Sequence, residues 1–286
     1  MYYPPNFDSK EAIELGKLVV EAYRQFECYK DPQAYAQKNG GKVWKLPAGY
    51  KLEATIIYNR WQLGFSVEET GPTLVDEEIA VVTAEAVIDP ETPASFNPIE
   101  DLFKDYPMGF VATSKDGKNA YLIFRGTVTK QEFLKDAKIA LQPYISPNWG
   151  YVALGFLEVY MACRESFIKV LAGLKPETNF YISGHSLGGA LSVLAFPDVV
   201  KTTSFKTPTL YNFGCPRVGD NGFVTAFNAI PSKVFRVVNS SDLVTTIPPP
   251  APIYYSHVDV PVEFNQQKND VGLNHSMDTY IAALGG

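Results

Sequence analysis

The sequence predicts an α/β fold with a largely parallel central sheet and helices on both faces of that sheet. Two observations support this prediction. Strand-like and helix-like segments alternate from residue 108 to the C-terminal end, which is typical of a parallel sheet covered by helices. In addition, the run Gly184-His185-Ser186-Leu187-Gly188 stands between a strand-forming segment and an Ala- and Leu-rich segment. That context is typical of a nucleophile elbow, a sharp strand-to-helix turn.

The composition of the sequence narrows the class of protein. The chain has 286 residues, of which 46% are hydrophobic and 20% are charged, as expected for a globular protein with a large core. A net charge of -6 argues against a nucleic-acid partner and against basic docking on anionic membranes. Three scattered cysteines, with no paired Cys-x-x-Cys, His-Glu-x-x-His or Walker loop, predict neither a disulfide framework nor a metal site. We expect no cofactor.

The first residues lack the basic start and apolar run of a secretory signal. The sequence also contains no apolar stretch long enough to span a membrane. We therefore expect a cytoplasmic protein, although a secreted form with its signal already removed would look the same.

The N-terminal part predicts one amphipathic helix followed by strands. Asp8 is expected to cap the helix, which places Leu15, Leu18 and Val19 on one face. Residues 50–58 and 79–88 are strand-like. We expect residues 1–107 to pack on a core formed by residues 108–286, so that the whole chain is a single domain.

The core begins with a predicted hairpin, since Asp116-Gly117 separates the strand-like runs 108–113 and 120–124. The second run ends in Phe124-Arg125-Gly126-Thr127. An apolar stripe at helical spacing then occupies residues 129–141. Such a short helix either belongs to the core or forms a lid over a site.

The remaining elements alternate as the predicted fold requires. The elements, in chain order, are a helix over 150–174, the elbow strand at 180–182, a helix over 187–196, a strand over 209–213, a helix near 222–230, a strand over 234–239 and a final helix over 277–284.

A serine at an elbow is a candidate nucleophile, but a hydroxyl needs a base and an acid group that orients the base. In this architecture the acid and then the histidine follow the serine in the chain. Asp242, just after a strand, is the preferred acid. Asp220 is the alternative, and its Asn221-Gly222 neighbours favour a turn.

The chain has three histidines. His185 lies within the elbow and is expected to face away from its tip. His257 precedes a period-two run and is expected at the start of an edge strand, whereas His275 lies in a loop before the final helix. His275 is therefore the preferred base. The backbone N–H of Leu187, at the start of the elbow helix, is a candidate oxyanion donor.

Four blocks in this order resemble the class 3, or fungal-type, lipases of the α/β-hydrolase superfamily. The blocks are 124–127, 184–190, 211–220 and 236–249, and the resemblance extends over residues 108–286. It implies the α/β-hydrolase fold, with Ser186 as nucleophile, Asp242 as acid and His275 as base. It also implies that Thr127 joins Leu187 in the oxyanion hole and that residues 129–141 form a lid helix.

The expected function is hydrolysis of acyl esters of lipids through a Ser-His-Asp triad and an acyl-enzyme intermediate. The partner would be a lipid or ester substrate at a lipid–water interface. Two alternatives remain open at this point: acyl transfer to an alcohol by the same triad, and non-catalytic lipid binding or scaffolding on the same fold.

Overall fold

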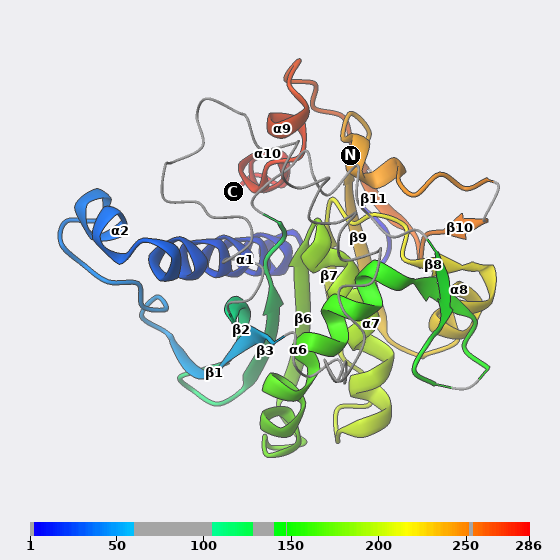
Figure 1. Ribbon diagram of the computed structural model, residues 1–286, viewed down its shortest axis with the longest axis horizontal. Helices are drawn as coiled ribbons and strands as arrows, with labels where there is room; N and C mark the ends of the chain where they lie inside the picture. The colour runs from blue at the N-terminus through cyan, green and yellow to red at the C-terminus, as the bar shows by residue number, and fades with distance from the viewer. Residues whose placement is uncertain (1–2, 60–104, 128–139, 147, 252–253) are drawn as a thin grey trace, which may run out of the picture.

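In the computed structural model, the described residues are 3–59, 105–127, 140–146, 148–251 and 254–286. Seven of the described strands form one sheet in the order β1-β2-β3-β6-β7-β9-β11 (Figure 1). Their bounds are β1 Tyr50–Tyr58, β2 Tyr106–Ser114, β3 Asn119–Phe124, β6 Asn179–His185, β7 Thr209–Phe213, β9 Lys233–Asn239 and β11 Pro261–Phe264.

The sheet is mixed at one edge and parallel elsewhere. β1 pairs antiparallel with β2, and β2 pairs antiparallel with β3 across the predicted hairpin. From β3 onward the neighbouring strands are parallel. The carboxyl ends of the five parallel strands therefore meet along one edge of the sheet, where ligand sites of α/β folds gather.

Helices cover both faces of the sheet, as the sequence predicts. On one face, α6 (Leu154–Ala172) and α7 (Leu187–Thr202) enclose a core of aliphatic and aromatic side chains. On the other face, α1 (Ser9–Lys30) and α10 (Met277–Ala283) pack with the inward side chains of β2, β7 and β9. Figure 1 shows α1 running across the sheet, so the N-terminal part contributes to this second core.

The N-terminal helix begins as expected. The Asp8 side chain accepts hydrogen bonds from the N–H groups of Lys10 and Glu11, and the helix buries Leu15, Leu18 and Val19. The sequence did not predict α2 (Pro32–Lys38), which begins at Asp31 with a proline in its first turn.

The helix expected over 150–174 differs at its start. Tyr151–Ala153 form strand β5, and α6 begins only at Leu154. β5 belongs to a small second sheet with β4 (Leu141–Pro143), β8 (Gly219–Asp220) and β10 (Tyr255–Ser256). Pairing with β4 and β8 thus outweighs the helical pattern of these three residues.

Helix α7 continues past Pro197, where the sequence predicted its end, and runs to Thr202. Asp198, the next residue, is buried and accepts hydrogen bonds from the Tyr160 hydroxyl and the Arg164 guanidinium of α6. These contacts, together with nearly complete burial of the helix, compensate for the N–H that proline lacks.

The C-terminal segment contains one further difference. The edge strand β11 covers only Pro261–Phe264, so His257 precedes it and lies outside any strand. A short helix α9 (Val271–Asn274) comes directly before His275, and α10 follows. His275 therefore connects two helices.

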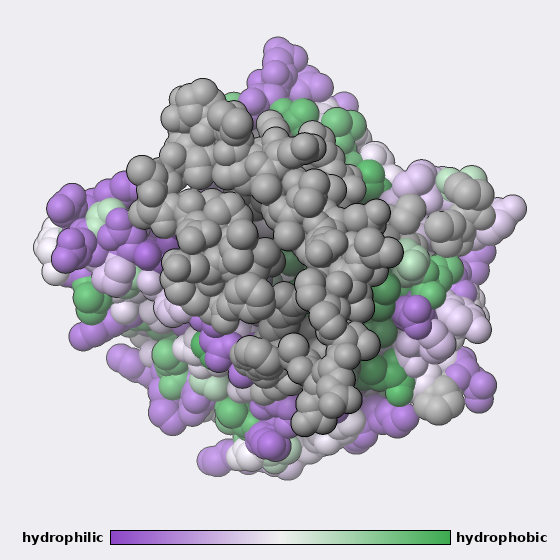
Figure 2. Space-filling view, viewed as in Figure 1, coloured by the Kyte–Doolittle hydropathy of each residue, from purple (hydrophilic) through white to green (hydrophobic). Residues whose placement is uncertain are grey.

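The strand expected over 79–88 lies outside the described residues, as do residues 129–139 of the expected lid; Leu141 begins strand β4. Among the helices that the structure describes, none combines the length and apolar content that crossing a bilayer requires. On the face drawn in Figure 2, hydrophilic residues cover much of the described surface, with hydrophobic patches among them.

Candidate active site

The elbow predicted around Ser186 is present between β6 and α7. Ser186 is the one residue that separates the two elements, and its backbone has φ 58° and ψ -125°. Side-chain-bearing residues rarely adopt a positive φ, so this serine is held in a strained conformation. Gly184 permits the sharp turn, because a Cβ there would collide with the carbonyl of Gly188. The Ser186 N–H donates to the Phe213 carbonyl at 3.0 Å, which ties the elbow to β7.

The candidate oxyanion donors lie beside this serine. A Cβ placed on Gly126 would be 2.8 Å from the Cβ of Ser186, so the residue that precedes Thr127 packs closely beside this serine. Thr127 Oγ1 is buried and has no hydrogen-bond partner among the described residues. Leu187 is the first residue of α7, where backbone N–H groups have no partner within the helix. This arrangement can bind a developing negative charge.

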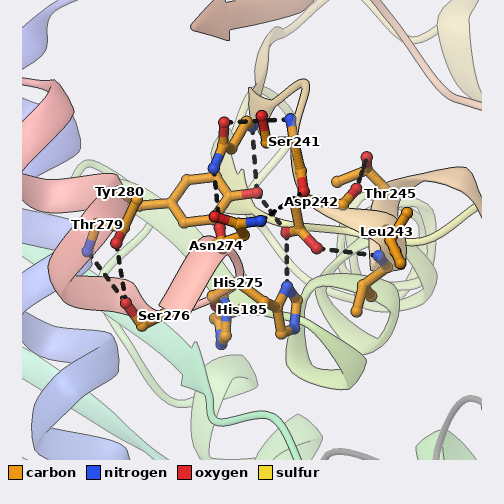
Figure 3. Close-up of polar contacts among 12 residues, drawn as sticks. His185, Ser241, Asp242, Leu243, Thr245, Asn274, His275, Ser276, Thr279 and Tyr280 are labelled. Carbon is orange, nitrogen blue, oxygen red and sulfur yellow. Dashed lines mark hydrogen bonds and ion pairs between the residues drawn. The ribbon is translucent and has the colours of Figure 1, made fainter. Parts of the chain in front are cut away.

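The predicted acid and base form a buried pair. Asp242 follows β9, is fully buried and caps the short 3-10 helix η2 (Leu243–Thr246) through a hydrogen bond from the Val244 N–H to Oδ1 at 2.9 Å. Its other oxygen, Oδ2, accepts from His275 Nδ1 at 2.6 Å (Figure 3). The carboxylate therefore fixes the orientation of the imidazole and leaves the hydrogen-free Nε2 to act as a base.

Tyr280 of α10 is a third member of this cluster that the sequence did not reveal. Its hydroxyl donates to the same Asp242 oxygen at 2.7 Å and accepts from the Asn239 N–H at 3.2 Å. Burial, and then the charge of Asp242, raise the pKa of Tyr280 well above its usual value, so the hydroxyl remains a donor. An aromatic residue in an amphipathic helix predicts only core packing, and no sequence signal indicated this role.

Two asparagines join the loop of the acid to the loop of the base. Asn239 Nδ2 donates to the Asn274 carbonyl at 2.9 Å. Asn274 Nδ2 donates to the Ser241 carbonyl at 3.1 Å, and Figure 3 labels both of these residues. Asn274 directly precedes His275, and Ser241 directly precedes Asp242. These bonds therefore hold the backbones of the acid and the base at a fixed separation.

His275 also meets the elbow. The rings of His185 and His275 lie 4.4 Å apart between centroids, and His185 Nε2 hydrogen-bonds the His275 carbonyl at 2.7 Å. His275 Nε2 is buried and has no hydrogen-bond partner among the described residues, so it forms none with the Ser186 hydroxyl. Catalytic hydrogen bonds in substrate-free sites are often long and tighten when substrate binds.

The two rival residues have other partners. Asp220 caps α8 (Asn221–Asn228) by accepting from the Phe223 N–H at 2.8 Å, as its turn-like surroundings indicated. His257 Nε2 hydrogen-bonds the Thr245 carbonyl at 2.8 Å. Burial, with the charge of Arg236 second, lowers the pKa of His257 to about 3, so this ring is neutral and held in place.

A family model and several curated proteins match part of this chain in sequence. The family model described as lipase (class 3) matches residues 121–251, which include Thr127, Ser186 and Asp242. Phospholipase A(1) DAD1, chloroplastic, of Arabidopsis thaliana is 31% identical over 49% of this chain and 38% of its own length. Phospholipase A1-II 3 of Oryza sativa subsp. indica is 30% identical, over 63% of this chain and 53% of its own length.

Two solved lipase structures also match part of this chain. A lipase from Rhizopus microsporus var. chinensis matches with a TM-score of 0.51 at 28% identity, over 55% of this chain and 57% of that one. The Rhizomucor miehei lipase propeptide complex matches with a TM-score of 0.51 at 26% identity, over 55% of this chain and 52% of that one. The chain spans between about two fifths and about half the length of the curated relatives named above. By family model and fold together, residues 121–251 of this chain match the class 3 lipase family, and the chain has the α/β-hydrolase fold.

Proposed function

We propose that this protein is a serine hydrolase that cleaves acyl esters of lipids. The observation that carries the proposal is the buried Asp242–His275 pair, because the His275 ring lies 4.4 Å from the ring of His185, in the elbow that presents Ser186. The curated relatives are named as phospholipases A1 and the structural neighbours as lipases, which supports a lipid ester as the substrate.

In the first half of the reaction, Ser186 Oγ attacks the ester carbonyl carbon and its proton passes to His275 Nε2. The carbonyl oxygen becomes an oxyanion that accepts hydrogen bonds from the N–H groups of Thr127 and Leu187, with Thr127 Oγ1 as a third donor. When the carbon–oxygen bond of the ester breaks, the protonated His275 gives the proton to the departing alcohol. The acyl group remains on Ser186.

In the second half, His275 takes a proton from a water molecule, and the resulting hydroxide attacks the acyl carbon. The tetrahedral intermediate again places its negative oxygen on the same donors. Its collapse releases the fatty acid and returns the proton to Ser186. The Asp242 carboxylate stabilises the imidazolium that forms twice in each cycle.

We infer further that the protein works at a lipid surface. Leu243, Val271 and Leu273 are 54%, 47% and 54% exposed, and they flank Asp242 and His275 in the chain. Exposed apolar side chains close in the chain to the residues of a site favour contact with lipid over contact with water. Because the net charge is -6, we propose that this contact depends on apolar burial rather than on attraction to anionic head groups.

The test is hydrolysis of matched esters combined with covalent labelling. A fluorophosphonate forms an Oγ–phosphorus bond and expels fluoride, so peptide mass mapping identifies the reactive serine. We expect labelling at Ser186, and release of fatty acid from phospholipid or triacylglycerol vesicles that the Ser186→Ala variant no longer supports. An assay with added alcohol separates fatty acid from alkyl ester as product.

Ser192→Ala is the matched control, since Ser192 is a buried serine of α7, the helix that follows Ser186, and its hydroxyl donates to the Gly189 carbonyl. It should retain turnover and labelling. Folded wild-type protein that neither reacts at Ser186 nor releases fatty acid would contradict the proposed function.

A further inference from the structure

A chain of hydrogen bonds links the three segments that carry the proposed machinery. The Gly126 N–H donates to the Tyr23 hydroxyl at 2.9 Å, Tyr23 Oη lies 2.7 Å from His185 Nδ1, and His185 Nε2 lies 2.7 Å from the His275 carbonyl oxygen. Gly126 precedes Thr127, His185 precedes Ser186, and His275 is the base. Tyr23 belongs to α1, outside the blocks that resemble the family.

The group at the end of this hydrogen-bond chain determines which atom donates and which accepts in each bond. The His275 carbonyl can only accept, so His185 Nε2 carries a hydrogen and donates it. In the neutral ring Nδ1 is then an acceptor, and it takes the hydroxyl hydrogen of Tyr23. The Tyr23 oxygen in turn accepts from Gly126. Burial raises the pKa of Tyr23 above its usual value, which keeps the hydroxyl protonated.

The same loop is held from its other side. Arg125 Nη1 donates to the Gly126 carbonyl at 2.7 Å, and Arg125 Nε donates to the Pro107 carbonyl at 2.8 Å. Because a trans peptide is planar, the Gly126 C=O and the Thr127 N–H lie in one plane and point in opposite directions. Fixing the Gly126 carbonyl therefore also fixes the direction of the Thr127 N–H, the proposed oxyanion donor.

The packing leaves no room for this loop to drift toward the nucleophile. A Cβ on Gly126 would collide with the Tyr23 hydroxyl and would lie 2.8 Å from both the His185 carbonyl oxygen and the Ser186 Cβ. Tyr23 therefore touches the loop at the point where that loop contacts the nucleophile. A shift there by a fraction of an ångström would move the donor away from the oxyanion.

Resting on the proposed function, we propose that Tyr23 and His185 are positioning residues that hold the oxyanion loop and the backbone of the base in register with Ser186. Tyr23 contacts neither the ester nor the proton in transit. It acts by fixing one end of the Gly126–Thr127 segment, while His185 transmits the restraint to His275. The N-terminal helix is thereby a working part of the active site.

The test is Tyr23→Phe, assayed with a soluble ester. We expect kcat to fall about 10- to 100-fold while KM changes less than about twofold, since misplacing one oxyanion donor affects the transition state and not substrate binding. Tyr211→Phe is the matched control. The Tyr211 hydroxyl also joins α1 to the sheet, through the Asp8 N–H and Glu11, so this variant loses stability but keeps its kcat.

A second variant, His185→Asn, keeps an acceptor near the Nδ1 position but is too short to reach the His275 carbonyl. We expect its kcat to fall by a factor in the same range. In the double variant Tyr23→Phe/His185→Asn, we expect the fall in kcat to be about as large as the larger of the two single falls. Either substitution alone already interrupts the hydrogen-bond chain between Gly126 and His275. The second substitution therefore adds little, and the two falls in kcat do not multiply.

Three results overturn the inference. The first is that the kcat of Tyr23→Phe stays within twofold of the wild-type value. The second is that the falls in kcat of the two single variants multiply in the double variant. In both cases the proposed function survives, because wild-type turnover and Ser186 labelling are measured in the same series. The third is wild-type protein without turnover, which overturns the proposed function and this inference with it.

Discussion

Replacing Tyr280 with phenylalanine removes one hydroxyl from the acid–base pair and leaves its shape nearly unchanged. Asp242 then keeps two of its three side-chain hydrogen bonds, from His275 Nδ1 and the Val244 N–H, and the Asn239 N–H loses its bond to the Tyr280 oxygen. A hydrogen bond to a buried charged group contributes about 1.5–3 kcal/mol. We therefore expect the free energy of unfolding to fall by about 2 kcal/mol.

Activity should fall as well, because the carboxylate that orients His275 would be held by fewer contacts. We expect kcat with a soluble ester to fall about 5- to 20-fold at constant KM, well short of the roughly 10⁴-fold loss that follows when a triad acid no longer sets the tautomer. Urea unfolding gives the stability, and initial rates across ester concentrations give the two kinetic constants.

Tyr160→Phe is the matched control for this experiment. The Tyr160 hydroxyl also donates to a buried carboxylate, that of Asp198, but on the opposite face of the sheet. It should cost similar stability and leave kcat unchanged. If Tyr280→Phe loses stability but keeps wild-type kcat, Tyr280 only supports the fold and the reasoning about the acid is wrong.

Three further outcomes are expected. Replacing both Leu243 and Leu273 by serine should lower the ratio of vesicle hydrolysis to soluble-ester hydrolysis about 10-fold, because the contact between protein and lipid surface then buries less apolar area. An unchanged ratio would mean that the lipid contacts another part of the protein. Gly126→Ala should lower kcat at least about 100-fold, since the new methyl group must displace the loop from Ser186, and wild-type rates would refute the close contact. The pKa of His257 is about 3 in the folded protein and near 6.5 unfolded, so only the unfolded state takes up this proton between those values. Stability should therefore fall by about 1.4 kcal/mol per pH unit below about 6.5 through this group, and urea unfolding of His257→Gln at pH 7 and 5.5 should show a smaller loss than wild type.

The elements that the sequence predicted well are those whose signals are local. The elbow was visible because its glycines, its flanking strand and its flanking helix are contiguous around Ser186. The hairpin at Asp116-Gly117 and the strand over residues 50–58 were visible for the same reason. The order of serine, acid and histidine, with only three histidines in the chain, then left few candidates for the pair that the structure joins.

What the sequence did not reveal depends on contacts between distant segments. Tyr151–Ala153 continue a helical pattern but pair with strands far along the chain. The helix end expected at Pro197 moved because α6 supplies partners to Asp198. Tyr23 and Tyr280 each look like core aromatics, and only the folded chain places their hydroxyls against the site.

The central claim is that Ser186 carries the acyl group between two half-reactions. Its most direct test is a rapid-quench reaction with a chromogenic ester, followed by mass analysis of the peptide that contains Ser186. We predict a burst of released alcohol close to one equivalent per protein and an acyl mass on Ser186, with both lost in Ser186→Ala. Turnover without any acyl mass on that peptide, or an acyl mass on another residue, would contradict the account.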